Sequence, residues 1–320
     1  MKRFQLHLAL CVVLLLTGLI GTITAAEGES GQRSFSLVVR EGFGSIKVGD
    51  LNTTLSSINS AYDSVREAYP KRCVGEILPL PNGFKDWEAE LQWKAWKGLS
   101  VGIAVSGPTR YYQKSFLTYS IIEEGTTQTE NDTWESEIHV SAPVKFNLYY
   151  SLPVISKVNL IINGGIGYYK ARIEQTWQWQ FRLPADTSSL GHTYFDVTGQ
   201  RIGYHCGLAL EYKFNERISM TVESQWRFAK IKSFKGSALT TDEQFDEYGN
   251  LLGSDSITED GFLYHYIGDD LRINYSRHEK IILTSLVPPW LGADSPSDIR
   301  KAFLDLSGFT FRIGLKIGLF

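Results

Sequence analysis

Residues 203–228 read GYHCGLALEYKFNERISMTVESQWRF, and this stretch decides the fold. Every second residue is apolar on either side of a short polar break at Asn215 and Glu216. The apolar positions are Tyr204, Cys206, Leu208, Leu210, Tyr212, Phe214, Ile218, Met220, Val222, Trp226 and Phe228. Because successive side chains of a β-strand point to opposite faces, the pattern predicts two strands joined by a tight turn, each with one apolar face and one polar face.

The same alternation recurs along the chain. We expect eight strands, around residues 34–46, 86–95, 99–106, 138–150, 158–166, 203–214, 218–228 and 309–319. Short breaks occur at 97–98, 153–156 and 215–216, whereas long polar connections fill 49–83, 107–133, 175–198 and 232–304. Short turns at one end and long loops at the other are typical of an all-β, antiparallel, up-and-down transmembrane β-barrel.

An even number of strands places both chain termini at the end of the barrel that carries the short turns. The last long connection leaves the strand number open. Residues 271–275 and 280–287 have the composition of one more hairpin, so a barrel of ten strands is the alternative to eight.

The polar faces of the predicted strands carry both acids and bases. An Arg or Lys side chain that faces lipid at the middle of a bilayer costs about 2–4 kcal/mol, so these faces must point into the barrel. The expected lumen-facing residues are Glu88, Glu90, Lys94, His139, Lys145, His205, Glu211, Glu223, Arg227, Arg312 and Lys316. Eight strands leave an interior that side chains just fill, so no wide aqueous pore is predicted.

The N-terminus has the features of a secretory signal peptide. Lys2 and Arg3 precede an apolar run, and Thr24, Ala25 and Ala26 offer small residues for cleavage. We expect residues 1–26 to be removed and residues 27–320 to form a single barrel domain in the bacterial outer membrane. An uncleaved membrane helix over residues 8–26 is the alternative.

The composition of the remaining chain excludes several classes of protein. Cleavage moves the formal net charge from −3 to about −5, because it removes Lys2 and Arg3 and no acid, and such a chain has no electrostatic footprint for nucleic acid. Residues 27–320 hold no apolar run near the roughly twenty residues of a membrane-spanning helix. Two cysteines, Cys73 and Cys206, are too few for a disulfide framework.

One connection is predicted to contain a helix. Asp50 is a suitable N-cap, and apolar residues recur every three or four positions over residues 51–69 before Pro70. This amphipathic segment either packs as a lid on the ends of the strands or rests in the membrane interface. Of the two, the lid is favoured.

Residues suited to chemistry are scattered. His139 and His205 fall on predicted lumen positions without an acid at metal-ligand spacing, and His139 beside Ser141 is a pairing that any polar strand face produces. The loop Tyr264–Asp270, which includes His265, Asp269 and Asp270, is followed by His278 and could hold a rim hydrolase. We expect no catalytic residue, no metal and no cofactor.

The strand APVKFNLYY, residues 142–150, and the segment GGIGYY, residues 164–169, resemble the outer-membrane β-barrel family of small barrels of the OmpA and OmpW type. The resemblance implies a monomer surrounded by outer-membrane lipid and inserted by the barrel-assembly machinery, which recognises a last strand ending in an aromatic residue. Phe320 matches that assembly signal. It departs from the family in sharing the register of Gly318 and Lys316, so a bulge must reorient it or the signal is a variant.

The sequence therefore predicts a non-enzymatic outer-membrane barrel with an envelope-structural role, a surface-interaction role, or a role in the passage of small molecules. A barrel-embedded hydrolase of the protease or lipase type, with its site at the outer rim, is the alternative, and a soluble periplasmic β-protein is a third reading. The assigned faces predict that Leu208→Arg blocks assembly whereas Ala209→Arg is tolerated better.

Overall fold

The computed structural model describes residues 35–68, 72–96, 98–123, 126–182, 187–270, 276–284 and 297–319. The predicted signal peptide and the predicted assembly signal Phe320 lie outside the described residues. Eight strands correspond to the eight expected ones: β1 (Phe35–Ser45), β4 (Gly83–Trp96), β5 (Leu99–Glu123), β6 (Thr126–Ile155), β7 (Val158–Arg182), β8 (Ser188–Lys213), β9 (Ile218–Phe228) and β16 (Gly308–Gly318).

These eight strands pair in a ring. Each pairs antiparallel with the next in the order β1, β4, β5, β6, β7, β8, β9 and β16, and β16 pairs with β1. The predicted antiparallel arrangement of eight strands is confirmed. The ten-stranded alternative needed one more hairpin from residues 271–275 and 280–287, and residues 271–275 lie outside the described residues. The hairpin that the last connection does form, β12 (Leu251–Asp270) with β13 (Ser276–Thr284), lies outside the ring, so the ring has eight strands and not ten.

The short turns lie at one end of the ring, together with the start of the first ring strand, β1, and the end of the last ring strand, β16. Phe35 at the start of β1 pairs with Trp93, and Gly318 at the end of β16 pairs with Ser36. At the same end, β6 turns into β7 at residues 156–157 and β8 turns into β9 at residues 214–217. The predicted placement of these strand ends beside the short turns is confirmed.

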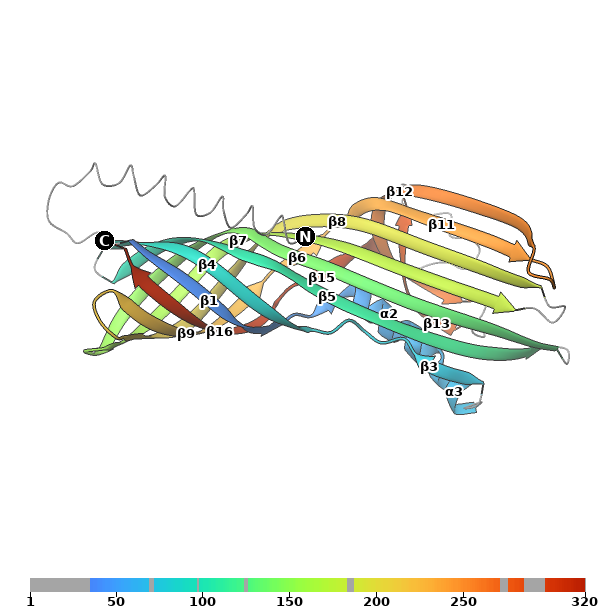
Figure 1. The fold of residues 1–320 in the computed structure, drawn as a ribbon, viewed down its shortest axis with the longest axis horizontal. Helices are drawn as coiled ribbons and strands as arrows, with labels where there is room; N and C mark the ends of the chain where they lie inside the picture. The colour runs from blue at the N-terminus through green and yellow to red at the C-terminus, as the bar shows by residue number, and fades with distance from the viewer. Residues whose placement is uncertain are drawn as a thin grey trace. The chain divides into compact units, whose positions relative to one another are not determined.

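The opposite end is built differently from the sequence-based expectation. Residues 107–133 and 175–198 were expected to be loops, but most of them are strand, because β5 to β8 continue far beyond the ends of β1, β9 and β16 (Figure 1). Other strands widen the sheet: β11 (Lys235–Phe245) pairs with β8, β12 pairs with β11, β13 and β14 (Ser297–Lys301) pair with β12, and β3 (Cys73–Glu76) pairs with β5. We call this part of the sheet beyond the ring the extension.

Two bulges separate the ring from the extension. Between Ser141 and Val144, β6 holds one residue more than the facing part of β7, and β5 holds one residue more than β6 between Ser106 and Thr109. A single extra residue moves every following side chain to the other face of the sheet. Each bulge contains a proline, Pro108 or Pro143, which lacks the N–H that a regular ladder needs.

The bulge in β6 overturns the predicted faces of the residues that precede it. Ile138 and Val140 were expected on the lipid face, but both are buried in the interior of the extension. His139 was expected in the lumen; it lies on the outer face instead, where it contacts Glu137. The period-two pattern was identified correctly on either side of Pro143, but its phase changes there.

An apolar core closes the interior beyond the polar part of the ring. A small sheet of β2 (Val48–Gly49), β10 (Lys230–Lys232) and β15 (Phe303–Asp305) contributes Val48, Ile231 and Leu304, all fully buried. These residues belong to one cluster with apolar side chains of β5 to β8. The chain between β9 and β11 therefore turns inward and plugs this end of the ring.

The predicted helix is present as α2 (Asp50–Ala61), followed by α3 (Asp63–Ala68). Leu51 and Leu55 of α2 are buried in the apolar core, as expected of a lid. Asp50 is not the N-cap: Gly49 holds that position with a φ of 84°, a conformation that favours glycine. The Asp50 carboxylate instead accepts hydrogen bonds from Arg300, at 2.5 and 2.9 Å, which tie the helix to β14.

Candidate functional site

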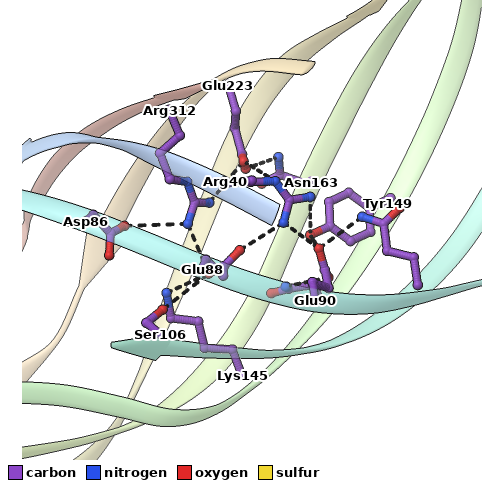
Figure 2. A network of polar contacts seen from close by, with 12 residues as sticks. Arg40, Asp86, Glu88, Glu90, Ser106, Lys145, Tyr149, Asn163, Glu223 and Arg312 are labelled. Carbon is purple, nitrogen blue, oxygen red and sulfur yellow. Dashed lines mark hydrogen bonds and ion pairs between the residues drawn. The ribbon is translucent and has the colours of Figure 1, made fainter. Parts of the chain in front are cut away.

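The interior of the ring is filled by a network of buried charges (Figure 2). Glu88 of β4 lies at its centre. Its carboxylate contacts Arg40 at 2.9 Å, Lys145 at 2.8 Å and Arg312 at 3.0 Å, so one acid binds cations from three other strands. Glu88 is fully buried, and this burial makes the pairing necessary because an unpaired charge in such a site is strongly unfavourable.

Three further acids belong to the network, and one of them, Asp86, lies 3.6 Å from Arg312. Glu90 accepts hydrogen bonds from Arg40 at 2.5 Å and from Tyr149 at 2.8 Å. Glu223, on the opposite side of the ring, contacts Arg312 at 3.0 Å and Arg40 at 3.1 Å. Arg40 and Arg312 therefore link the acids of β4 to the acid of β9 across the interior, as Figure 2 shows.

Most of the predicted lumen residues are buried in the ring. This group comprises Glu88, Glu90, Lys145, His205, Glu211, Glu223, Arg227 and Arg312. Lys316 is half-buried and contacts Glu211 at 3.3 Å. Lys94 is exposed at the end of β4, where a bulge between Lys94 and Trp96 interrupts the pairing with β5. His139 does not join the group.

Sequence reasoning missed the residue that holds the network together. Arg40 lies on β1, the strand with the least regular alternation, and it was not among the expected lumen residues. The signal was present, since Arg40 shares a face of β1 with Val38 and Ser36 and all three are buried. Tyr149 was also missed, although it falls on the predicted polar face of its strand, whereas Asp86, on the predicted polar face of β4, is buried in the ring as that face predicts.

The free space inside the ring is small. The ring encloses a cavity with a volume of about 30 Å³, measured with a probe the size of a water molecule. Its lining includes Arg40, Tyr149, Glu211, Glu223 and Lys316. This volume suits two or three waters, since one water needs roughly 10–15 Å³ on this measure. Among the described residues, buried charged side chains occupy the interior of the ring, and the apolar core lies beyond them.

The outer surface of the ring is largely apolar, although Glu41 of β1 is also exposed there, opposite Trp87 and Ile313. One exposed large apolar residue from each of the eight strands illustrates this: Val39, Trp87, Ile103, Phe146, Ile166, Leu208, Met220 and Ile313. On β8 the outward positions from Tyr212 to Ile202 extend over ten residue steps. At about 3.4 Å per residue and a tilt of roughly 40°, this band is about 26 Å tall, close to the apolar band of roughly 25 Å in outer-membrane barrels.

Charged residues replace the apolar ones where the extension begins. On β7 the outward position after Tyr168 is Lys170, followed by Arg172 and Glu174. Arg172 binds Asp196 of β8 through two hydrogen bonds, at 2.8 and 2.5 Å, and this interaction raises the pKa of Arg172 above its usual value. The outer surface therefore changes from lipid-like to water-like chemistry over two residues.

The same outer face brings Glu137, His139 and Glu174 close enough for a metal ion to bind all three. Arg110 already pairs with Glu137, and Arg172 pairs with Glu174 at 2.5 Å. With both carboxylates held by guanidinium groups, the arrangement is a ladder of ion pairs across β5, β6 and β7. Sequence reasoning missed it because it assigned His139 to the lumen.

The expected rim loop is a strand. Residues 264–270 belong to β12 and pair with β13, so the prediction of a loop was wrong. His265 is 1% exposed and lies opposite Ile281, while His278 lies opposite Gly268, three residues along the strand. The side chains of Asp269, Asp270 and His278 lie outside the described residues. A buried His265 is poorly suited to meet a substrate at an open rim.

The comparisons with known proteins give a broad likeness. No protein-family model and no curated protein matches the sequence, so membership of the OmpA and OmpW type family stays a prediction. The crystal structure of a major outer membrane protein from Thermus thermophilus matches with a TM-score of 0.30 and 10% identity, over 90% of this chain and all of that one. A Pseudomonas aeruginosa FadL homologue matches with a TM-score of 0.16 and 6% identity, over 89% of this chain and 90% of that one.

With scores this low, the architecture rests on the pairing of the chain's own strands. No helix in the described ranges is long and apolar enough to cross a membrane. The described residues form an eight-stranded antiparallel ring with a charged interior, an apolar outer surface and a large sheet extension at one end.

Proposed function

We propose that the protein is an outer-membrane β-barrel that anchors the extension at the cell surface and has no open channel. The observation that carries this proposal is the contrast between the two surfaces of the ring. Its outside carries exposed apolar residues on all eight strands, whereas its inside holds paired charges and is followed by an apolar plug. An apolar outside suits lipid, and a filled inside does not suit passage of solutes.

The extension supports a surface-interaction role. Its strands continue well beyond the apolar band, and their outward positions carry charged and polar residues such as Lys170, Glu174 and Asp196. Polar outer faces suit water rather than lipid. Because the short turns lie at the opposite end of the ring, the extension would face away from the periplasm.

The route to this location is part of the proposal. Residues 1–26 would direct export and be removed, the barrel-assembly machinery would insert the chain with Phe320 as its signal, and the barrel would work as a monomer in outer-membrane lipid. Only α-helices and closed β-barrels pair all their backbone hydrogen-bonding groups within a bilayer. The complete ring of paired strands therefore supports insertion of this chain as a monomer.

Conductance across a planar lipid bilayer tests the absence of a channel. We expect the purified, inserted protein to give no stable current steps, since Arg40, Glu88 and Arg312 span the interior. A matched open porin measured in the same bilayer is the positive control. Reproducible current steps from the wild-type protein would show that the interior opens, and the proposed sealed anchor would be wrong.

A further inference from the structure

The hairpin of β11 and β12 has a free edge. Residues 251–261 of β12 pair with β11 on one side, while β13 and β14 pair with β12 from residue 262 onward (Figure 1). Among the described residues, nothing pairs with the other side of residues 251–260. This edge is about 33 Å long at roughly 3.3 Å per residue, and it leaves a row of backbone donors and acceptors open.

Both faces of this edge strand are exposed. All of residues 251–260 are exposed, including the large apolar side chains of Leu251, Leu252 and Ile257. Natural sheets protect edge strands with charged side chains, lysine above all, with proline or with a bulge. Here the charged residues are the acids Asp255, Glu259 and Asp260. Residues 251–260 contain no lysine and no proline, and the one irregularity in the hairpin lies at its tip, between Gln244 and Phe245.

The hairpin is strongly acidic. Residues 242–260 contain seven acids and no Lys or Arg: Asp242, Glu243, Asp246, Glu247, Asp255, Glu259 and Asp260. On one face of the edge strand, Asp255 and Glu259 flank Ile257 at alternate positions. An apolar side chain between two carboxylates matches a partner strand that carries a cation, an apolar residue and a second cation in alternation.

We propose that residues 251–260 dock a basic, extended segment of a partner protein, which adds to β12 as a new strand. The main-chain ladder supplies affinity, and Asp255, Ile257 and Glu259 select the partner's side chains. This inference rests on the proposed function, because the hairpin meets such a partner only if the extension is outside the membrane.

Electrostatic repulsion disfavours two other partners at this edge, a second copy of the chain and the phosphate groups of lipids. A second copy of the chain would bring its own seven acids to the same edge, and like charges opposite each other destabilise a strand pair. Phosphate groups of lipids are anionic and would be repelled in the same way. A basic strand is the occupant that relieves the repulsion among the hairpin's own carboxylates.

Binding of a designed peptide to the full chain in detergent micelles tests the proposal. The probe is the peptide Lys-Thr-Val-Thr-Lys-Thr-Val-Thr-Lys with a fluorescent label, and fluorescence anisotropy reports its affinity. We expect binding together with slower amide hydrogen exchange over residues 251–260. A peptide with Pro in place of every Thr keeps the charge but cannot form a continuous ladder, and it should not bind.

Paired variants separate the site from general charge. Asp255→Asn with Glu259→Gln should weaken binding about tenfold or more, whereas Glu67→Gln with Glu216→Gln makes the same change in net charge at exposed acids elsewhere and should leave binding unchanged. Equal binding of the two peptides, equal effects of the two double variants, or unchanged exchange over residues 251–260 would each overturn the inference.

Failure of the inference is distinguishable from failure of the proposed function. A cysteine placed at Ser254 and tested on intact cells with a membrane-impermeant maleimide reports whether the hairpin is at the surface. If it is labelled and the peptide does not bind, strand addition is wrong and the anchor stands. If it is not labelled on intact cells but reacts after lysis, the proposed location of the extension is wrong.

Discussion

At the scale of single residues, the ring depends on charges that have no access to bulk water. Glu88, Glu90, Asp86 and Glu223 are four acids against the three bases Arg40, Lys145 and Arg312, all of them nearly or fully buried. Arg bridges two acids at once through its planar guanidinium group, which is why Arg40 and Arg312 occupy the centre while Lys145 binds at one side. Because each member of the network pairs with its neighbours, the ion pairs hold these side chains in place inside the ring.

Glu88→Gln removes the acid that three cations share. We expect the free energy of unfolding to fall by about 3–5 kcal/mol, the usual cost of breaking a buried ion pair, because Lys145 and Arg312 lose their shared partner. Urea unfolding in lipid vesicles, followed by tryptophan fluorescence, measures the change. Glu216→Gln in the exposed turn after β8 is the control and should alter stability by less than about 0.5 kcal/mol. An equal, small effect of both variants would contradict the role of the network.

At the scale of elements, period-two alternation predicted the ring strands well, because lipid outside and charge inside impose it on each of them. It failed at Pro143, where one extra residue reverses the faces, and it did not predict that β5 continues through the second bulge, at Pro108, because the strand was expected to end at residue 106. The sequences SGPT at 106–109 and SAPV at 141–144 carry that signal. The sequence does not distinguish the ends of β5 to β8 from loops, because both faces of a strand can be polar where the strand continues beyond the membrane.

Prediction of the interior charges followed the same logic. Residues such as Glu88 and Glu223 lie on strands whose other face is apolar. If that apolar face contacts lipid, the charged side chains must point into the barrel. Arg40 was missed because its strand contains Glu41 and two glycines, which blur the alternation. The acidic hairpin could not be located from the sequence, since its free edge depends on where β13 begins to pair with β12.

Ile138→Ala tests the phase change produced by the β6 bulge. Ile138 is fully buried in the apolar core, so the truncation should lower the free energy of unfolding by about 2–5 kcal/mol. If the alternation had continued through Pro143, Ile138 would face outward and its truncation would cost far less. His139→Ala at the neighbouring outward position is the control in the same urea experiment, and a larger loss in this control than in Ile138→Ala would show that the faces are assigned wrongly.

At the scale of the whole molecule, the outer surface of one sheet suits lipid in the ring and water in the extension. The ring exposes apolar residues outward and buries charges, whereas the extension exposes charges outward and buries apolar residues. The switch lies between Tyr168 and Lys170 on β7 and between Ile202 and Gln200 on β8. This inversion is the physical basis for placing the ring in the bilayer and the extension in water.

Substitution of two leucines of similar exposure, one on the ring and one on the extension, compares these two surfaces. Leu208 on the ring is 47% exposed and Leu239 on β11 is 38% exposed. Leu208→Arg should destabilise the inserted protein by about 2–4 kcal/mol, since it puts a cation into lipid, whereas Leu239→Arg should change stability by less than about 0.5 kcal/mol. Unfolding from lipid vesicles gives both values, and similar values for the two variants would mean that the surfaces meet the same solvent.

The most direct measurement of the central claim uses a native cysteine. Cys206 is exposed on the outer surface of β8, and the other described cysteine, Cys73, is buried. A nitroxide label on Cys206 in lipid vesicles should collide readily with oxygen and rarely with a water-soluble nickel complex. A label at Thr198→Cys in a Cys206→Ser background, eight residues along β8 in the extension, should show the reverse. High accessibility of both labels to nickel would contradict a membrane around the ring.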